Sequence, residues 1–142
     1  MDWARDLADR KKQELEGKRI QQEKDLSDRK MLDAHANPMW DELRQEIGKA
    51  VEEFNQAMGS AYITSHKAAS GPDRVVLEMD GATHTILFMS QIWTVIGPGG
   101  YSYKLTVVAG NGVVWKNQNG NTFGSEMIAR NEVTATVNKK NH

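Results

Sequence analysis

Residues 37–59 read NPMWDELRQEIGKAVEEFNQAMG, and this stretch decides the fold. Asn37 is a good helix N-cap, Pro38 suits the first helical position, and Gly59 is a natural C-terminal stop. Large apolar residues recur between them at steps of three and four, the spacing of one face of an α-helix. This stripe consists of Trp40, Leu43, Ile47, Val51, Phe54 and Met58. The stretch therefore predicts an amphipathic helix over 38–58 that packs on a core.

The residues before this helix have a different character. Residues 1–36 are rich in charged residues of both signs, and opposite charges such as Glu14 and Lys18 lie one helical turn apart. Their apolar residues scatter around the helical wheel and form no heptad seam, so a coiled coil is not predicted. We expect a charged helical extension over 1–36 that is frayed by itself and becomes stably helical only when it binds a partner. We expect a globular domain over 37–142.

From Ala61 onward the period shifts toward two, as in β-strands. The candidate strands are Tyr62–His66, Arg74–Met79, Thr83–Ile96, Tyr101–Ala109, Val113–Lys116 and a short edge segment at Thr122-Phe123. Thr83–Ile96 is long for one strand, and the sequence leaves open whether it is one bent strand or two strands separated near Ser90-Gln91. Tight turns between consecutive segments favour an antiparallel meander, because parallel strands need long crossovers.

The strongest local signal is Asn111-Gly112, which is the preferred two-residue hairpin chemistry between two β-type runs. The last segment is ambiguous, since Ser125 is a good start for a helix while 133–137 alternates like a strand; a helix starting near Ser125 is favoured. The expected fold is α+β. A charged N-terminal helix precedes an amphipathic helix packed on an antiparallel sheet of about four to six strands, and a short C-terminal helix follows.

Composition excludes several classes of function. The chain of 142 residues has a formal net charge of −1 and no cysteine. A nearly neutral chain gives no field that attracts nucleic acid or an anionic membrane, and the lack of cysteine excludes disulfides and thiolate chemistry. We find no secretory signal and no apolar run long enough to span a bilayer. A cytoplasmic protein with no nucleic-acid or membrane partner is expected.

No motif of catalysis, cofactor binding or metal binding is present. The histidines His35, His66, His84 and His142 lack metal-binding spacing such as H-x-x-x-H. Glu78 and Asp80 would share a strand face, an arrangement that hydrolases use, and His66 or His84 is the candidate partner. The loop 97–100 is rich in glycine but precedes a β-type segment, so a phosphate-binding loop is not expected. We therefore expect no enzyme, no cofactor and no metal.

The β-rich region gives one hint of association. Apolar residues occupy both alternating positions of 86–96, whereas a solvated sheet face should be more polar. The candidate interface residues are Trp93, Tyr101, Tyr103 and Trp115. A homo-oligomer or a complex with a protein partner is the expected state.

Three functions follow in order of preference. The first is a non-enzymatic protein-interaction or oligomerisation module. The alternative is a small-molecule or lipid-binding domain with a cavity between helix 38–58 and the sheet. The third is a hydrolase-type enzyme that uses His66 or His84.

Overall fold

A computed structural model describes residues 2–65, 70–110 and 112–138. The elements are α1 (Trp3–Met58), β1 (Thr64–Ser65), β2 (Arg74–Met79), β3 (Ala82–Met89), the 3-10 turn η1 (Ser90–Ile92), β4 (Thr94–Ile96), β5 (Ser102–Val108), β6 (Gly112–Asn117), β7 (Thr122–Phe123) and α2 (Ser125–Asn138). The predicted α+β class is confirmed.

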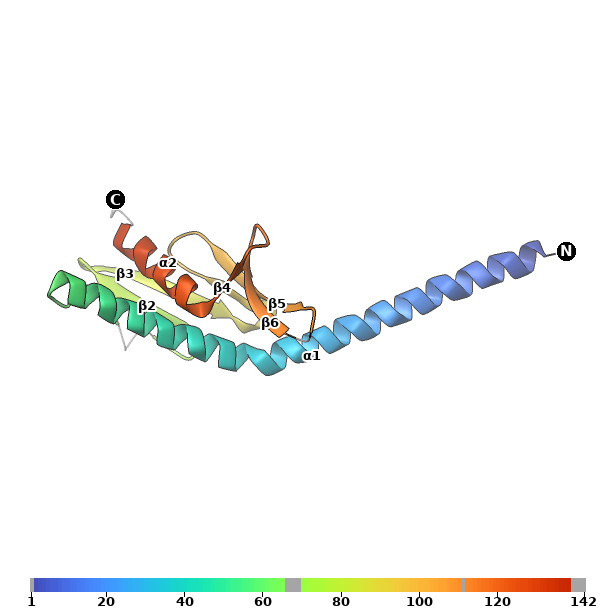
Figure 1. Cartoon of the computed structure of the whole chain (residues 1–142), viewed down its shortest axis with the longest axis horizontal. Coiled ribbons are helices and arrows are strands. Elements are labelled where there is room, and N and C mark those ends of the chain that lie inside the picture. The colour runs from blue at the N-terminus through green and yellow to red at the C-terminus, as the bar shows by residue number, and fades with distance from the viewer. Residues whose placement is uncertain (1, 66–69, 111, 139–142) are drawn as a thin grey trace.

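The strands form one curled antiparallel sheet of seven strands in the order β1-β2-β3-β4-β5-β6-β7. This order is the predicted meander, with somewhat more strands than the sequence indicated. Both helices lie along the same side of the sheet, with α2 beside the second half of α1 (Figure 1). None of the helices in the described part of the chain is long and apolar enough to span a bilayer.

The helix α1 is continuous through Asn37-Pro38, so the predicted helix start at Asn37 is wrong. Proline inside a helix removes the hydrogen bond to the carbonyl four residues earlier, which here belongs to Ala34. Ala34 is exposed, so water can satisfy that carbonyl and the helix can continue. Figure 1 shows α1 bending where its colour turns from blue to cyan, as expected of a proline kink.

Burial divides α1 into two halves. Every residue from 3 to 27 is exposed, and we call this segment the rod. We call residues 36–58 the core segment, because it carries all the buried residues of the helix: Ala36, Trp40, Leu43, Ile47 and Ala50. Most of the predicted apolar stripe therefore faces inward, although Met58, at its end, is exposed.

Aromatic contacts join the core segment to the sheet. Trp40 stacks on Phe88 of β3 with ring centroids 5.4 Å apart, and Phe88 meets Trp115 of β6 edge to face at 6.1 Å. The indole Nε1 of Trp40 donates a hydrogen bond of 2.8 Å to the carbonyl of Pro72. Trp40 therefore anchors α1 to the sheet through both its ring and its polar atom.

The segment Thr83–Ile96 forms two strands instead of one bent strand. After β3 the chain turns through η1, and Trp93 adopts a left-handed conformation with φ of 50°. β4 then pairs antiparallel with β3, and Phe88 lies opposite Val95. Val95 is buried and the next residue, Ile96, is exposed. A strict period of two along 86–96 would place Val95 on the face of Leu87 and Ile96 on the face of Phe88. The structure differs because the turn interrupts this period.

Several local predictions are confirmed. β2 has the predicted bounds, and the turn at Asp80-Gly81 has both residues in the left-handed region, with φ of 53° and 77°. β5 and β6 form the predicted hairpin, in which Val108 lies opposite Gly112. Asn111 of the predicted turn lies outside the described residues.

The two ends of the sheet region differ from each other in how well they were predicted. Only Thr64–Ser65 of the predicted strand Tyr62–His66 is a strand, and His66 lies outside the described residues. At the other end α2 begins at Ser125 as predicted. Residues 133–137 belong to this helix, so their strand-like alternation did not decide their structure.

Candidate functional site

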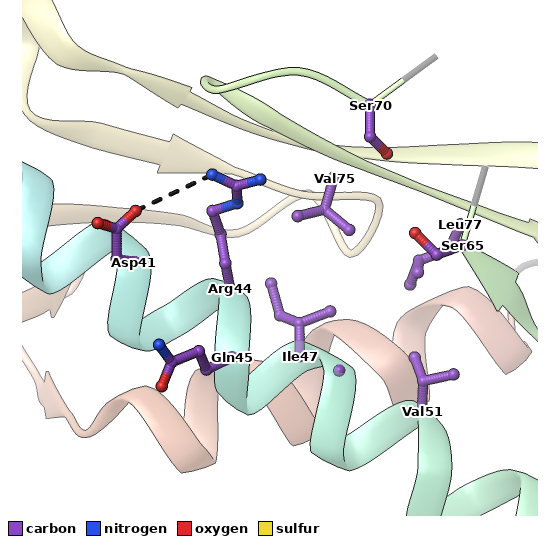
Figure 2. Close-up of a pocket in the computed structure, with 10 residues that line it drawn as sticks. Asp41, Arg44, Gln45, Ile47, Val51, Ser65, Ser70, Val75 and Leu77 are labelled. Carbon is purple, nitrogen blue, oxygen red and sulfur yellow. Dashed lines mark ion pairs between the residues drawn. The ribbon is translucent and has the colours of Figure 1, made fainter. Parts of the chain in front are cut away.

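An open groove of about 510 Å³ lies between α1 and the strands β1 and β2. We call it the Arg44 groove, and Figure 2 shows a close-up of it. It is lined by Asp41, Arg44, Gln45, Ile47, Gly48 and Val51 of α1 and by Ser65, Ser70, Val75 and Leu77 from the sheet side. Its volume lies within the range typical of small-molecule sites.

The core segment builds one wall of the groove with a second stripe of residues. Positions 41, 44, 48 and 51 follow one another at steps of three, four and three, so they lie on one face of the helix. This face lies beside the buried stripe that contains Leu43 and Ile47. The same helix therefore contributes one stripe to the core and a neighbouring stripe to the groove.

The floor of the groove is apolar. Ile47 of α1 and Leu77 of β2 are buried, and Val51 and Val75 are half-buried. Figure 2 shows Ile47 and Val75 pointing toward each other across the gap between helix and strand. Val51 and Val75 are only half-buried and retain contact with water, and a ligand that displaces this water is favoured.

Gly48 leaves space in the groove because it has no side chain. A Cβ atom added at this position would meet nothing within 4 Å, so close packing is not the reason for the glycine. Glycine inside a helix costs about 1 kcal/mol relative to alanine. A side chain at position 48 would extend into the groove between Arg44 and Val51, and the glycine leaves that space open.

Arg44 and Asp41 place one charge of each sign at one end of the groove. The Nη1 of Arg44 lies 3.9 Å from Oδ1 of Asp41, an ion pair too long for a hydrogen bond (Figure 2). Within the described residues Arg44 makes no closer polar contact, and Asp41 is largely exposed. Such a pair contributes little to stability, so most of the hydrogen-bonding capacity of the guanidinium is free for an anionic group.

The four predicted interface residues do not form one surface. Tyr103 and Trp115 are each 1% exposed and belong to the core, whereas Tyr101 is 52% exposed. Trp93 is half-buried, and its Nε1 donates a hydrogen bond of 2.9 Å to Oδ1 of Asp33 on α1. An interface between folded chains can therefore use Tyr101 and one edge of Trp93, and this use stays a prediction.

Tyr103 is polar as well as buried. Desolvation raises the pKa of Tyr103, and the side chain of Asn131 on α2 opposes this shift. Its ring meets that of Phe123 edge to face at 5.6 Å. These contacts join β5 to β7 and to α2.

The residues considered for a hydrolase are not brought together. His84 lies opposite Leu77 on the inner face of the sheet and is buried, while Glu78 lies opposite Thr83 on the outer face. Asp80 is in the turn after β2, and His66 lies outside the described residues. Among residues 2–65, 70–110 and 112–138, no group of three or more His, Asp or Glu side chains could hold a metal ion.

Sequence reasoning missed one buried carboxyl group, that of Glu132 on α2. The side chain is 0% exposed, and its Oε2 accepts a hydrogen bond of 3.4 Å from the backbone N–H of Gly99. Burial raises the pKa of Glu132, and the Gly99 hydrogen bond opposes this shift more weakly. A Cβ atom on Gly97 would lie 2.0 Å from Oε2, so the loop can seat on the carboxyl group only because residue 97 is glycine.

The burial of Glu132 can be predicted from a helical wheel of residues 125–138. Glu132 lies one turn from both Ile128 and Thr136, which are buried on the same face. Glu132 therefore belongs to the core face of the helix once the segment is taken as helical.

Comparisons with protein-family models, with curated proteins and with solved structures found no match.

Proposed function

We propose that this protein is a non-enzymatic interaction module in which α1 is both part of the core and a rigid spacer. One observation carries the proposal: the exposed rod and the buried core segment are parts of a single helix. At about 1.5 Å per residue, the rod extends the domain by about 40 Å. A binding group at the end of the rod farthest from the domain is held away from the domain along a defined direction.

The rod is supported by contacts along its own surface. Arg19 forms ion pairs with Glu16 and Glu23, and Lys24 pairs with Asp28 at 2.9 Å. Each exposed pair is weak. The core segment, however, already holds the helix in place, and extending a formed helix avoids the unfavourable nucleation step. The rod can therefore stay helical before it meets a partner.

The end of the rod farthest from the domain carries the apolar residues best suited to recognition. Trp3 is 70% exposed, and Leu7 lies one turn away on the same face and is also exposed. Tryptophan is enriched among residues that dominate binding energy. The larger apolar residues farther along the rod, Leu15, Ile20 and Leu26, do not continue the face of Trp3 and Leu7, which supports a local contact at that end. The partner that we propose is a second copy of this chain.

Light scattering tests this proposal. We expect the full chain to form a dimer or a larger species, and a chain that begins at Ser27 to be monomeric. Trp3→Ala should weaken association, whereas Leu15→Ala, which truncates a similarly exposed residue of the rod, should leave it unchanged. A monomeric full chain at every concentration would contradict self-association.

A second candidate is a small-molecule or lipid-binding domain. The Arg44 groove favours it, because the groove lies between the core segment and the sheet and has an apolar floor. A small ligand that binds in the groove should slow the hydrogen exchange of the backbone amides that line it. If no ligand does so, this candidate fails while the spacer proposal stands.

A further inference from the structure

The Arg44 groove has one charged end and an apolar body. Arg44 lies near the start of the groove stripe and Val51 lies at its end, seven residues later. At about 1.5 Å per residue this distance is about 10 Å along the helix axis. A flexible hydrocarbon chain of medium length fits this span.

The charged end selects the headgroup. The Arg44 guanidinium is positively charged at all physiological pH values and presents its donors in a planar fork that matches a carboxylate. Its existing partner, Asp41, lies at 3.9 Å, so a ligand carboxylate can bind without first breaking a strong contact. Asp41 also repels a ligand carboxylate, but it is largely exposed, so water and salt screen this repulsion.

The apolar body selects the tail. Ile47, Val51, Val75 and Leu77 line it with methyl groups from both walls. Gly48 leaves a passage over the helix between the charged end and Val51, because the glycine has no side chain and even an added Cβ atom would meet none of the described residues within 4 Å.

We propose that the Arg44 groove binds a single-chain carboxylate amphiphile, with its carboxylate on Arg44 and its hydrocarbon chain across Gly48 onto the apolar floor. This inference rests on the ligand-binding candidate above and names its ligand class. It does not depend on self-association of the rod.

Isothermal titration calorimetry of the full chain with decanoate tests the proposal, with decanol as the neutral probe of equal chain length. We expect decanoate to bind at least about tenfold more tightly than decanol, since a charge-assisted bidentate contact is lost with the alcohol. Arg44→Gln should remove this difference and leave the binding of decanol unchanged.

Two glycine variants locate the site. Gly48→Leu fills the passage and should abolish the binding of decanoate. Gly17→Leu is the matched control, because Gly17 is also a helical glycine with nothing within 4 Å but lies on the rod. Leucine favours helix over glycine at both positions, so circular dichroism and the melting temperature should show that both variants fold.

The outcomes distinguish failure of the proposed ligand class from failure of the broader ligand-binding candidate. Decanol binding as tightly as decanoate would overturn the carboxylate assignment and leave the ligand-binding candidate standing. Decanoate binding to Gly48→Leu as tightly as to the unaltered chain would overturn the placement in the groove. If neither probe binds the unaltered chain, the ligand class is overturned, and hydrogen exchange with other ligands then decides the broader candidate.

Discussion

The rod and the core segment are two halves of one helix, and they are held by different forces. In the rod every residue is exposed, and the contacts run between charged side chains three or four residues apart. In the core segment the buried side chains make apolar contacts with residues far apart in sequence, such as that of Trp40 with Phe88. Two segments of one helix can therefore contribute very differently to the stability of the chain.

The largest expected effect separates the two tryptophans of α1. Trp40→Ala removes a stacked ring and the hydrogen bond to Pro72, and we expect a loss of about 3–5 kcal/mol in the free energy of unfolding. Trp3→Ala, on the exposed rod, should change it by less than about 0.5 kcal/mol. Urea denaturation measures both values, and similar losses for the two variants would refute the division between rod and core segment.

The next effect concerns the buried carboxyl group. Because burial raises the pKa of Glu132 in the folded state, the folded state binds the proton more tightly than the unfolded state. The contribution of this group to stability is therefore highest below the unfolded pKa of about 4.3 and falls as pH rises through the folded pKa. Glu132→Gln, which stays neutral, should be more stable than the unaltered chain at pH 7, with a difference that shrinks toward pH 4.

Thermal denaturation across this pH range measures that difference. An equal shift in melting temperature at every pH would show that the carboxyl group does not titrate on unfolding. Glu126→Gln is a suitable control, because Glu126 lies on the same helix but is exposed.

A smaller effect should distinguish the two helical glycines. Both Gly17 and Gly48 have free space around the Cβ position, so alanine is sterically acceptable at either site. Gly48→Ala should raise the free energy of global unfolding by about 1 kcal/mol, because the core segment unfolds with the domain. Gly17→Ala should raise the helicity of the rod and leave the global value nearly unchanged. Equal changes in the global value, measured by urea denaturation, would mean that the rod and the domain unfold as one unit.

The smallest effect concerns the ion pairs of the rod. The hydrogen bond from Arg19 lowers the pKa of Glu16, which is the opposite direction from Glu132. The support that Glu16 gives the rod is therefore present above its unfolded pKa and is lost as pH falls through the lowered folded pKa. Hydrogen exchange should show faster exchange of the rod amides in Arg19→Gln and in high salt. Unchanged rod amides in both conditions would assign the helicity of the rod to something other than its charges.

Local patterns predicted much of the fold. Three features that depend on residues close together in sequence were predicted correctly. They are the bounds of β2, the turn at Asp80-Gly81 and the start of α2 at Ser125. The groove was expected only as a cavity between helix 38–58 and the sheet. Its charged end at Arg44 and its passage at Gly48 were not predicted, because they depend on which face of the helix meets β2.

The sequence by itself determined the charged first segment, the apolar stripe of the second and the meander of short strands, because period and turn chemistry act over a few residues. Only the tertiary structure decided that α1 continues through Pro38, that Tyr103 and Trp115 are core residues, and that Glu132 lies under Gly97. The last two of these depend on contacts between segments distant in sequence. The energy of such contacts can outweigh a local preference, and a pattern of nearby residues does not contain it.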